Sequence, residues 1–135
     1  MIDATTAPYA ALLLRITLGI LFLAHGLTKV IVYKPSGTVA SFRAMGQPPI
    51  VAWLSMIGEV GGGAALIVGF APRYIALLLV PLMLGTIFVV HGRNGWMFSN
   101  KGGGWEYPAF WTVALIVQSL LGDGPFALLS SPGWV

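Results

Sequence analysis

The chain contains no cysteine and few charged residues. Among its 135 residues, Asp, Glu, Lys and Arg together make up only 8%. The lack of cysteine excludes disulfides, thiolate nucleophiles, Cys-ligated zinc, iron–sulfur clusters and the covalent attachment of c-type haem. The net charge of +3 arises from basic residues spread singly along the chain. Without a basic run, nothing in the sequence favours nucleic-acid binding.

Apolar residues are abundant instead. They account for 57% of the chain, and the mean hydropathy is +0.87. This composition is typical of an integral membrane protein, and the length fits a single membrane domain over residues 1–135. The first apolar segment is too long for the core of a signal peptide and follows no basic residue, so we expect it to be retained.

Apolar runs separated by helix breakers predict an all-α fold, an integral membrane four-helix transmembrane bundle. Prolines stand where helices begin well, at Pro8, Pro48 and Pro108. The connection at residues 71–73 is long enough only for a tight reversal, so the helices on either side should be antiparallel neighbours. We expect helices over about residues 8–32, 48–70, 73–91 and 107–121, joined by interfacial loops at 33–47 and 92–106.

The 33–47 loop and the third helix each contain a feature that bears on the fold. Val39, Phe42 and Met45 recur at helical spacing in the 33–47 loop, which predicts a short amphipathic segment on the membrane surface. This segment is either a lid over a site or a plain connection. Pro81 lies inside the third helix, where a membrane bundle tolerates a kink because neighbouring helices can satisfy the freed carbonyl.

Four crossings would place both termini on one side of the membrane and both loops on the other. Basic residues tend to stay on the cytoplasmic side. We therefore expect the loops to face the cytoplasm, because they carry Lys34, Arg43, Arg93 and Lys101.

The first helix carries a stripe of ionisable residues. At 100° per residue, Arg15, His25 and Lys29 fall on one arc together with Leu18 and Phe22. Ionisable groups in membrane helices rarely face lipid. The stripe is therefore expected to face a protein interior or a wet cavity.

Glu59 lies near the middle of the second helix, at membrane depth. A carboxylate there would be costly if it were ionised and unpaired, so it should be protonated or paired with a cation. We expect Arg15 to be its partner, and Glu106 to pair with Lys29 nearer the loop face. Such pairs either fix the register of the helices or provide a proton path or the polar end of a ligand pocket.

Small residues accompany Glu59 on the second helix. Gly58 and Gly62 have the small-xxx-small spacing that lets another helix approach closely. With Ser55 and Glu59 they occupy one third of the helix circumference. Glu59 is therefore expected to lie against a neighbouring helix.

His25 and His91 both lie towards the loop face and, with Glu59 and Glu106, could line one cavity. Each histidine could equally be a packing residue. The two histidines differ in depth, which disfavours bis-histidine haem ligation, and the sequence has no close ligand spacing such as His-x-x-x-His. We therefore expect no haem, no metal and no covalent cofactor.

The ordered set of motifs resembles the DoxX family of small bacterial membrane proteins. The resemblance covers nearly the whole chain, although the segment after the fourth helix departs from the family's usual ending. The matching residues are Arg15 with Leu18-Gly19, His25-Gly26-Leu27-Thr28-Lys29, Phe42 with Gly46-Gln47-Pro48, Gly58-Glu59-Val60-Gly61-Gly62, Gly69 with Arg73, His91, and Gly103-Gly104-Trp105-Glu106-Tyr107-Pro108.

This resemblance implies a multi-pass protein of the bacterial inner membrane, associated with redox metabolism and similar to the DoxD subunit of a thiosulfate:quinone oxidoreductase. We expect a quinone-interacting subunit of a membrane oxidoreductase system, in contact with lipid and with a partner oxidoreductase subunit. The ligand-binding or proton-relay candidates are Arg15, His25, Lys29, Glu59, His91 and Glu106. The alternatives are a non-catalytic accessory or anchoring subunit of a larger complex and, third, a transporter or proton channel. The sequence identifies no catalytic residue and leaves open whether the chain is an enzyme.

Overall fold

The computed structural model describes residues 3–133, and the regular secondary structure in this part of the chain is helical, with one isolated β-bridge between Phe70 and Leu129. Two of the long helices continue into π-helical turns, η1 and η2, and a short 3-10 turn, η3, follows η2. The elements in chain order are α1 (Ala7–Leu27), η1 (Thr28–Val32), α2 (Lys34–Ala44), α3 (Pro49–Val68), α4 (Pro72–Gly85), η2 (Thr86–His91), η3 (Gly92–Asn94) and α5 (Glu106–Leu121).

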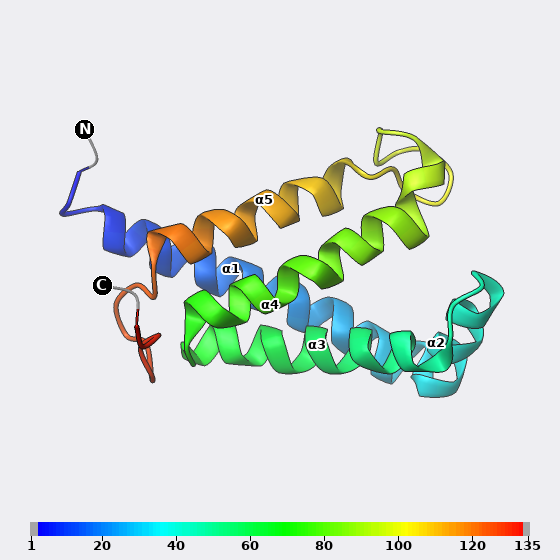
Figure 1. The fold of residues 1–135 in the computed structure, drawn as a ribbon, viewed down its shortest axis with the longest axis horizontal. Coiled ribbons are helices and arrows are strands. Elements are labelled where there is room, and N and C mark those ends of the chain that lie inside the picture. The colour runs from blue at the N-terminus through cyan, green and yellow to red at the C-terminus, as the bar shows by residue number, and fades with distance from the viewer. Residues whose placement is uncertain (1–2, 134–135) are drawn as a thin grey trace.

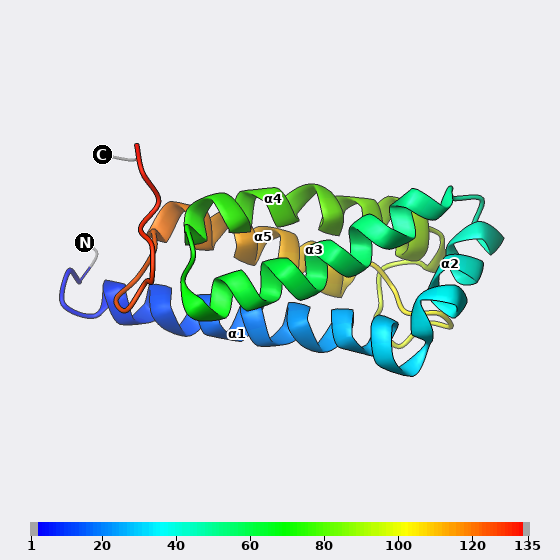
Figure 2. The same ribbon diagram turned by 90° about the horizontal axis from the view of Figure 1, so that it is seen from below.

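The four long helices α1, α3, α4 and α5 run side by side, with both termini at one end of the molecule (Figure 1, Figure 2). α2 and the connection between η3 and α5 lie at the opposite end, which we call the loop end. α1 packs mainly against α3, and α4 packs mainly against α5. The expected antiparallel pairing of the second and third predicted helices is confirmed by α3 and α4.

The helix boundaries follow local backbone chemistry. A proline stands in the first turn of α1, α2, α3 and α4, where its missing N–H is not needed by the helix. α3 ends at Gly69 with φ of 76°, and Ala71 follows with φ of 40°, so the chain reverses at once into α4. The 33–47 loop, which was expected to hold a short amphipathic segment, contains the 11-residue helix α2.

Within residues 3–133, three helical segments are long and apolar enough to cross a membrane, namely Ala7–Val32, Pro49–Val68 and Pro72–Asn94. α5 has 16 residues, which span about 24 Å at 1.5 Å per residue. This length falls short of a hydrocarbon core of roughly 30 Å. The expected all-helical membrane fold is therefore seen in the described residues, but the length of α5 does not establish a fourth complete crossing.

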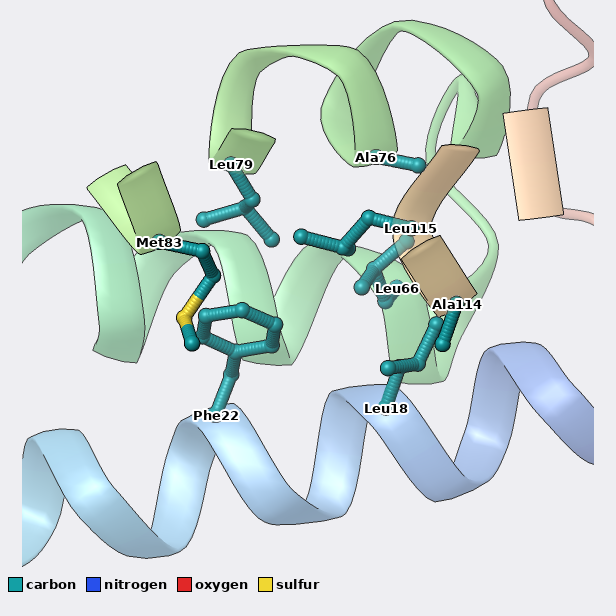
Figure 3. Packing of buried hydrophobic residues seen from close by; sticks show 8 residues of the cluster. All are labelled: Leu18, Phe22, Leu66, Ala76, Leu79, Met83, Ala114 and Leu115. Atoms are coloured by element: carbon teal, nitrogen blue, oxygen red, sulfur yellow. The ribbon is translucent and has the colours of Figure 1, made fainter. Parts of the chain in front are cut away.

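One hydrophobic core is shared by α1, α3, α4 and α5 (Figure 3). Leu18 and Phe22 of α1 meet Leu66 of α3, Leu79 of α4 and Leu115 of α5, and each of these side chains is at most 3% exposed. Large apolar side chains also cover the outer faces of the same helices. An apolar core inside an apolar exterior is the arrangement expected of a bundle that lipid surrounds.

Glycine permits the closest helix contact, which lies between α1 and α3. A Cβ atom on Gly63 would lie 2.6 Å from the backbone nitrogen of Leu23 and 2.8 Å from the carbonyl oxygen of Gly19. Gly58 and Gly62, which we expected to admit a neighbouring helix, instead meet leucine side chains of α4. The closest backbone approach on α3 is thus one residue beyond the predicted small-xxx-small pair.

The segment after α5 packs onto the turn between α3 and α4. The N–H of Leu129 donates to the carbonyl of Gly69 at 3.1 Å, and its carbonyl accepts from the N–H of Ala71 at 2.8 Å. Asp123 accepts from the backbone N–H and the hydroxyl of Ser131 at 2.8 and 2.7 Å. These contacts fix the chain across the terminal end of the bundle.

Candidate functional site

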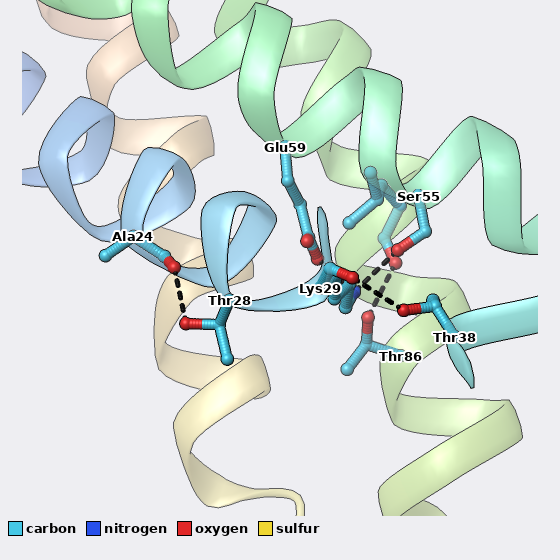
Figure 4. A network of polar contacts seen from close by, with 8 residues as sticks. Ala24, Thr28, Lys29, Thr38, Ser55, Glu59 and Thr86 are labelled. Atoms are coloured by element: carbon cyan, nitrogen blue, oxygen red, sulfur yellow. Dashed lines mark hydrogen bonds and ion pairs between the residues drawn. The ribbon is translucent and has the colours of Figure 1, made fainter. Parts of the chain in front are cut away.

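Lys29 and Glu59 form an ion pair between η1 and α3 (Figure 4). Nζ of Lys29 lies 2.6 Å from Oε1 of Glu59 and donates a second hydrogen bond of 2.6 Å to Oγ of Ser55. Ser55 precedes Glu59 by about one helical turn, so both acceptors lie on the same face of α3. The cluster of Lys29, Ser55 and Glu59 is the polar centre of the candidate site.

The ion pair is largely removed from solvent. The side chain of Glu59 is 7% exposed and that of Lys29 is 24% exposed. Within residues 3–133, Oε2 of Glu59 is a buried oxygen without a hydrogen-bond partner. An unpaired charge at this depth would bear its full desolvation cost, which the opposite charge partly offsets. The expected pairing of Glu59 with a cation is confirmed, but the cation is Lys29 and not Arg15.

η1 and α2 together position Lys29. The hydroxyl of Thr38 on α2 donates to the carbonyl of Lys29 at 2.9 Å. The ring of Phe42, one turn further along α2, has its centroid 5.8 Å from Nζ of Lys29, close enough for a cation–π contact. π-helical turns such as η1 often occur at functional sites. α2 therefore holds the ion pair in place from the loop end.

A cavity of about 500 Å³ lies between α3 and the α4–η2 helix, next to the ion pair. Its walls are mostly apolar, which is typical of small-molecule sites whose few polar groups set ligand orientation. The lining residues are Phe42, Val51, Leu54, Ser55, Gly58, Gly62, Ile75, Leu78, Leu79, Pro81, Leu82, Gly85, Thr86, Val89 and Val90.

Ser55 and Thr86 are the hydroxyl groups in this lining, and their roles differ. Oγ of Ser55 accepts a hydrogen bond from Lys29, and among the described residues its own proton has no acceptor. Oγ1 of Thr86 donates to the carbonyl of Leu82 at 3.0 Å, which leaves its lone pairs available. Ser55 can therefore donate a hydrogen bond into the cavity, and Thr86 can accept one.

The two histidines lie apart from this cluster. The ring of His25 meets Trp111 edge to face, with centroids 5.1 Å apart. Nδ1 of His91 lies 2.8 Å from the carbonyl oxygen of Gly103. In the described part of the chain, no three His, Asp or Glu side chains gather as metal ligands do. The structure thus gives each histidine its own contact, and neither lines the cavity beside Ser55.

Glu106 also lies away from Lys29, so the predicted Glu106–Lys29 pair is wrong. Glu106 opens α5 and lines a shallower hollow with Trp96, Tyr107 and Phe110. Lys29 is instead bound to Glu59 of α3, and η1 has its main contacts with α1 and α2 and not with α5.

Arg15 lies near the terminal end of the bundle, and its predicted pairing with Glu59 is wrong. It is 1% exposed, and its Nη2 donates to the carbonyl of Pro125 at 3.2 Å. Along α1, Arg15 is about 21 Å from Lys29 at 1.5 Å per residue. In the antiparallel register of α1 and α3, Gly26 lies against Glu59, whereas Arg15 lies beside Gly69. The register therefore decides which cation Glu59 meets.

Thr38 and Thr86 were not predicted as site residues from the sequence, and Ser55 was predicted only as a neighbour of Glu59. The spacing of Ser55 one turn before Glu59 was a usable signal. Thr38 and Thr86 carried no such signal, because they come to the site from other elements.

The fold and the site together define a class: a helical membrane protein with a buried ion pair beside an apolar cavity. The DoxX family profile matches residues 10–92, which is more than half of the chain. The chain belongs to the DoxX family, and the resemblance seen in its motifs is confirmed.

Relatives share the membrane location. Inner membrane protein YqjF of Escherichia coli (strain K12) is 37% identical over 95 residues, which cover 67% of this chain and 72% of YqjF. Inner membrane protein YphA of the same strain is 27% identical over 128 residues, 90% of this chain and 89% of YphA. With three apolar helices, these relatives identify the chain as a multi-pass inner membrane protein.

A third relative has a name that refers to redox chemistry. The Bacillus subtilis (strain 168) protein named "Putative oxidoreductase CatD" is 34% identical over 79 residues. These residues make up 58% of this chain and 58% of CatD, so the match spans less than two thirds of either protein. No solved structure matches the chain.

Proposed function

We propose that this DoxX protein is a quinone-interacting subunit of a membrane oxidoreductase system, with α5 as a fourth membrane helix. The quinone binds in the cavity between α3 and α4, and a separate partner protein supplies the electrons. The single observation that carries this proposal is Ser55, which touches both the apolar cavity and the Lys29–Glu59 pair.

The donor set of the cavity fits a quinone. A quinone carbonyl accepts hydrogen bonds, and the free proton of Ser55 is available for one. A quinol hydroxyl donates, and Thr86 can accept from it. Oε2 of Glu59 has no hydrogen-bond partner among the described residues, so Glu59, which is joined to Ser55 through Lys29, can accept a proton.

Reduction of a quinone to a quinol consumes two electrons and two protons. Both electrons come from a redox centre in the partner protein. As charge builds on the quinone oxygen beside Ser55, the serine passes its proton to that oxygen and takes one from the ammonium of Lys29. The carboxylate of Glu59 then takes a proton from water that enters beside the exposed part of Lys29, and it passes this proton to Lys29. The second proton reaches the other oxygen from water at the loop end.

The six site residues predicted from the sequence have different roles under this proposal. Lys29 and Glu59 adjoin the cavity through Ser55 and carry the proton path. His25, His91 and Glu106 remain predicted candidates nearer the loop end. Arg15 has a packing role at the other end, where it meets the segment after α5.

Binding of decylubiquinone to the protein in nanodiscs tests the proposal. Ser55→Ala removes the donor to the head group and is expected to weaken binding about tenfold, the effect of one hydrogen bond of about 1.4 kcal/mol. Ser41→Ala is the matched control, because its exposed hydroxyl bonds only to the carbonyl of Gly37 within α2. If folded Ser55→Ala protein binds the quinone as tightly as the Ser41→Ala control, the proposal is rejected.

The proton path needs a separate measurement. Glu59→Gln is expected to leave quinone affinity within about threefold, because Glu59 does not line the cavity. It is expected to slow quinone reduction about tenfold in native membranes that contain the partner, since general acid–base steps contribute effects of this size or larger. An unchanged reduction rate would remove Glu59 from the mechanism.

The second candidate function is a non-catalytic anchoring subunit. One observation favours it: Trp96, Met97 and Phe98 in the connection before α5 are each about half exposed, at 51%, 50% and 51%. Exposed apolar side chains in a loop often mark a protein or membrane contact. Native mass spectrometry of the gently extracted protein separates the two functions. A bound quinone supports the first, and a stoichiometric protein partner without a quinone supports the second.

A further inference from the structure

The cavity between α3 and α4 is elongated along the helices. It follows α4 and η2 from Ile75 to Val90, about 22 Å at the helical rise. Figure 1 shows α3 and α4 adjacent at their connecting turn and diverging towards the loop end. A Cβ on Gly58 or on Gly62 would lie 2.8 Å from a leucine side chain of α4. Towards the turn, the cavity is therefore closely lined by aliphatic side chains of α4.

Polar groups occupy only one part of this cavity. Ser55 and Thr86 lie in the part near the loop end, whereas the lining towards Ile75, which we call the aliphatic part, consists of glycine and aliphatic side chains. From Thr86 to Ile75 the helix rises about 16 Å. An apolar passage of this length exceeds what a quinone ring alone can fill.

The rim of the cavity opens onto the outer surface of the bundle. Leu54 and Leu78 both line the cavity and are 60% and 70% exposed. In a membrane this surface faces lipid and not water. A molecule dissolved in the bilayer can therefore enter sideways between α3 and α4.

We infer that the ligand carries a linear apolar tail, with its head group at Ser55 and Thr86 and its tail running between α3 and α4 past Gly62 and Leu78. This inference rests on the proposed function, and it specifies a lipid-dissolved, tailed quinone as the substrate class. The hydroxyl-bearing part suits a ring with two oxygens, and the aliphatic part suits a chain. Gly58 and Gly62 line the cavity without a side chain, so that the leucines of α4 lie directly against α3 there.

Two quinones with the same head group test this inference. Decylubiquinone has a ten-carbon tail, and the dimethoxy-methyl-benzoquinone head group without a tail is its matched probe. Both affinities are measured in nanodiscs and expressed relative to the concentration of each quinone in the lipid phase. The different partitioning of the two quinones into lipid then does not affect the comparison. Gly62→Leu, which places a side chain in the aliphatic part, is expected to weaken decylubiquinone binding about tenfold. It should change the affinity for the tail-less head group by less than about twofold.

Gly61→Leu is the matched control. Gly61 neighbours Gly62 on α3, but a Cβ there meets nothing within 4 Å, and the residue does not line the cavity. It is expected to change neither affinity. If Gly62→Leu weakens both quinones equally, or neither of them, the tail does not lie between α3 and α4 and the inference is overturned. If the parent protein binds neither quinone, the proposed function itself has failed.

A second measurement avoids any change in packing. Because the chain has no cysteine, Leu78→Cys provides a unique position for a nitroxide label on the rim of the aliphatic part. Decylubiquinone is expected to reduce the mobility of the label, whereas the tail-less head group at equal occupancy should leave it unchanged. If the label is already immobile and responds to neither quinone, a lipid chain fills the passage, which also overturns the inference.

Discussion

The guanidinium of Arg15 on α1 occupies the space that any side chain at position 69 would need. A Cβ atom on Gly69 would overlap Nη1 of Arg15 and lie 2.7 Å from the Cα of Ala127. Gly69 also has φ of 76°, a conformation that glycine adopts without strain. A single glycine therefore allows α3 to end, the chain to turn and a buried arginine to pack.

Gly69→Ala is expected to lower the free energy of unfolding by about 2 to 3 kcal/mol. The left-handed conformation costs an alanine about 1 to 2 kcal/mol, and displacing Arg15 adds to this. Gly61→Ala serves as the control, because it fills open space on a helix and should be neutral or stabilising by up to about 1 kcal/mol. Unfolding in mixed detergent micelles measures both. Equal stability of the two variants would contradict the packing role of Gly69.

Removing one partner of the Lys29–Glu59 pair is expected to cost more than removing both charges. Lys29→Met alone should lower the free energy of unfolding by about 3 kcal/mol, because it leaves a buried carboxylate without its cation. Lys29→Met combined with Glu59→Gln should recover at least about 1 kcal/mol of this loss. The four proteins of this double-mutant cycle are compared in the same detergent. Additive losses would show that the two side chains are not coupled.

Thr38→Val is expected to loosen η1 without disrupting α2. The variant keeps the shape of the side chain but removes the hydrogen bond to the carbonyl of Lys29, a loss of about 1 kcal/mol. Hydrogen exchange of the amides of residues 28–33 should become about fivefold faster. Ser41→Ala, on the same helix, should leave those amides unchanged. If both variants behave alike, α2 does not hold η1 in place.

Asp123→Ala is expected to release the segment that follows α5. The carboxylate accepts two hydrogen bonds from Ser131, and bonds to a charged group are worth about 1.5 to 3 kcal/mol each. Cleavage within residues 124–131 by a protease of broad specificity should become at least tenfold faster. Ser130→Ala changes an exposed neighbour and should have no effect. Unchanged cleavage of the Asp123→Ala protein would show that other contacts suffice to hold the segment.

Much of the helical pattern could be predicted from the sequence, because hydropathy and breakers act locally. The expected helices at 8–32, 48–70, 73–91 and 107–121 correspond to α1 with η1, α3, α4 with η2, and α5. The helix in the 33–47 loop was expected only as a short segment. The π-helical turns could not be predicted, since the packing around them sets their extra backbone spacing.

The candidate site was predicted in part. The polar stripe of the first helix does face inward at Arg15 and Lys29, as the periodicity indicated. Its members do not share one cavity, however, because a stripe that runs the length of a helix reaches different neighbours at each level. Lys29 meets α3, and Arg15 meets the segment after α5.

The sequence by itself determined that this chain is a helical membrane protein with buried charges that need partners. Hydropathy, helical period and the cost of an unpaired charge in an apolar medium are properties of the residues themselves. Only the tertiary structure decided that Lys29 and not Arg15 meets Glu59, and that Ser55 joins this pair to a cavity. The physical reason is axial register: spacing along one helix fixes which residues share a face, but the packing of antiparallel helices fixes which residues lie at the same depth.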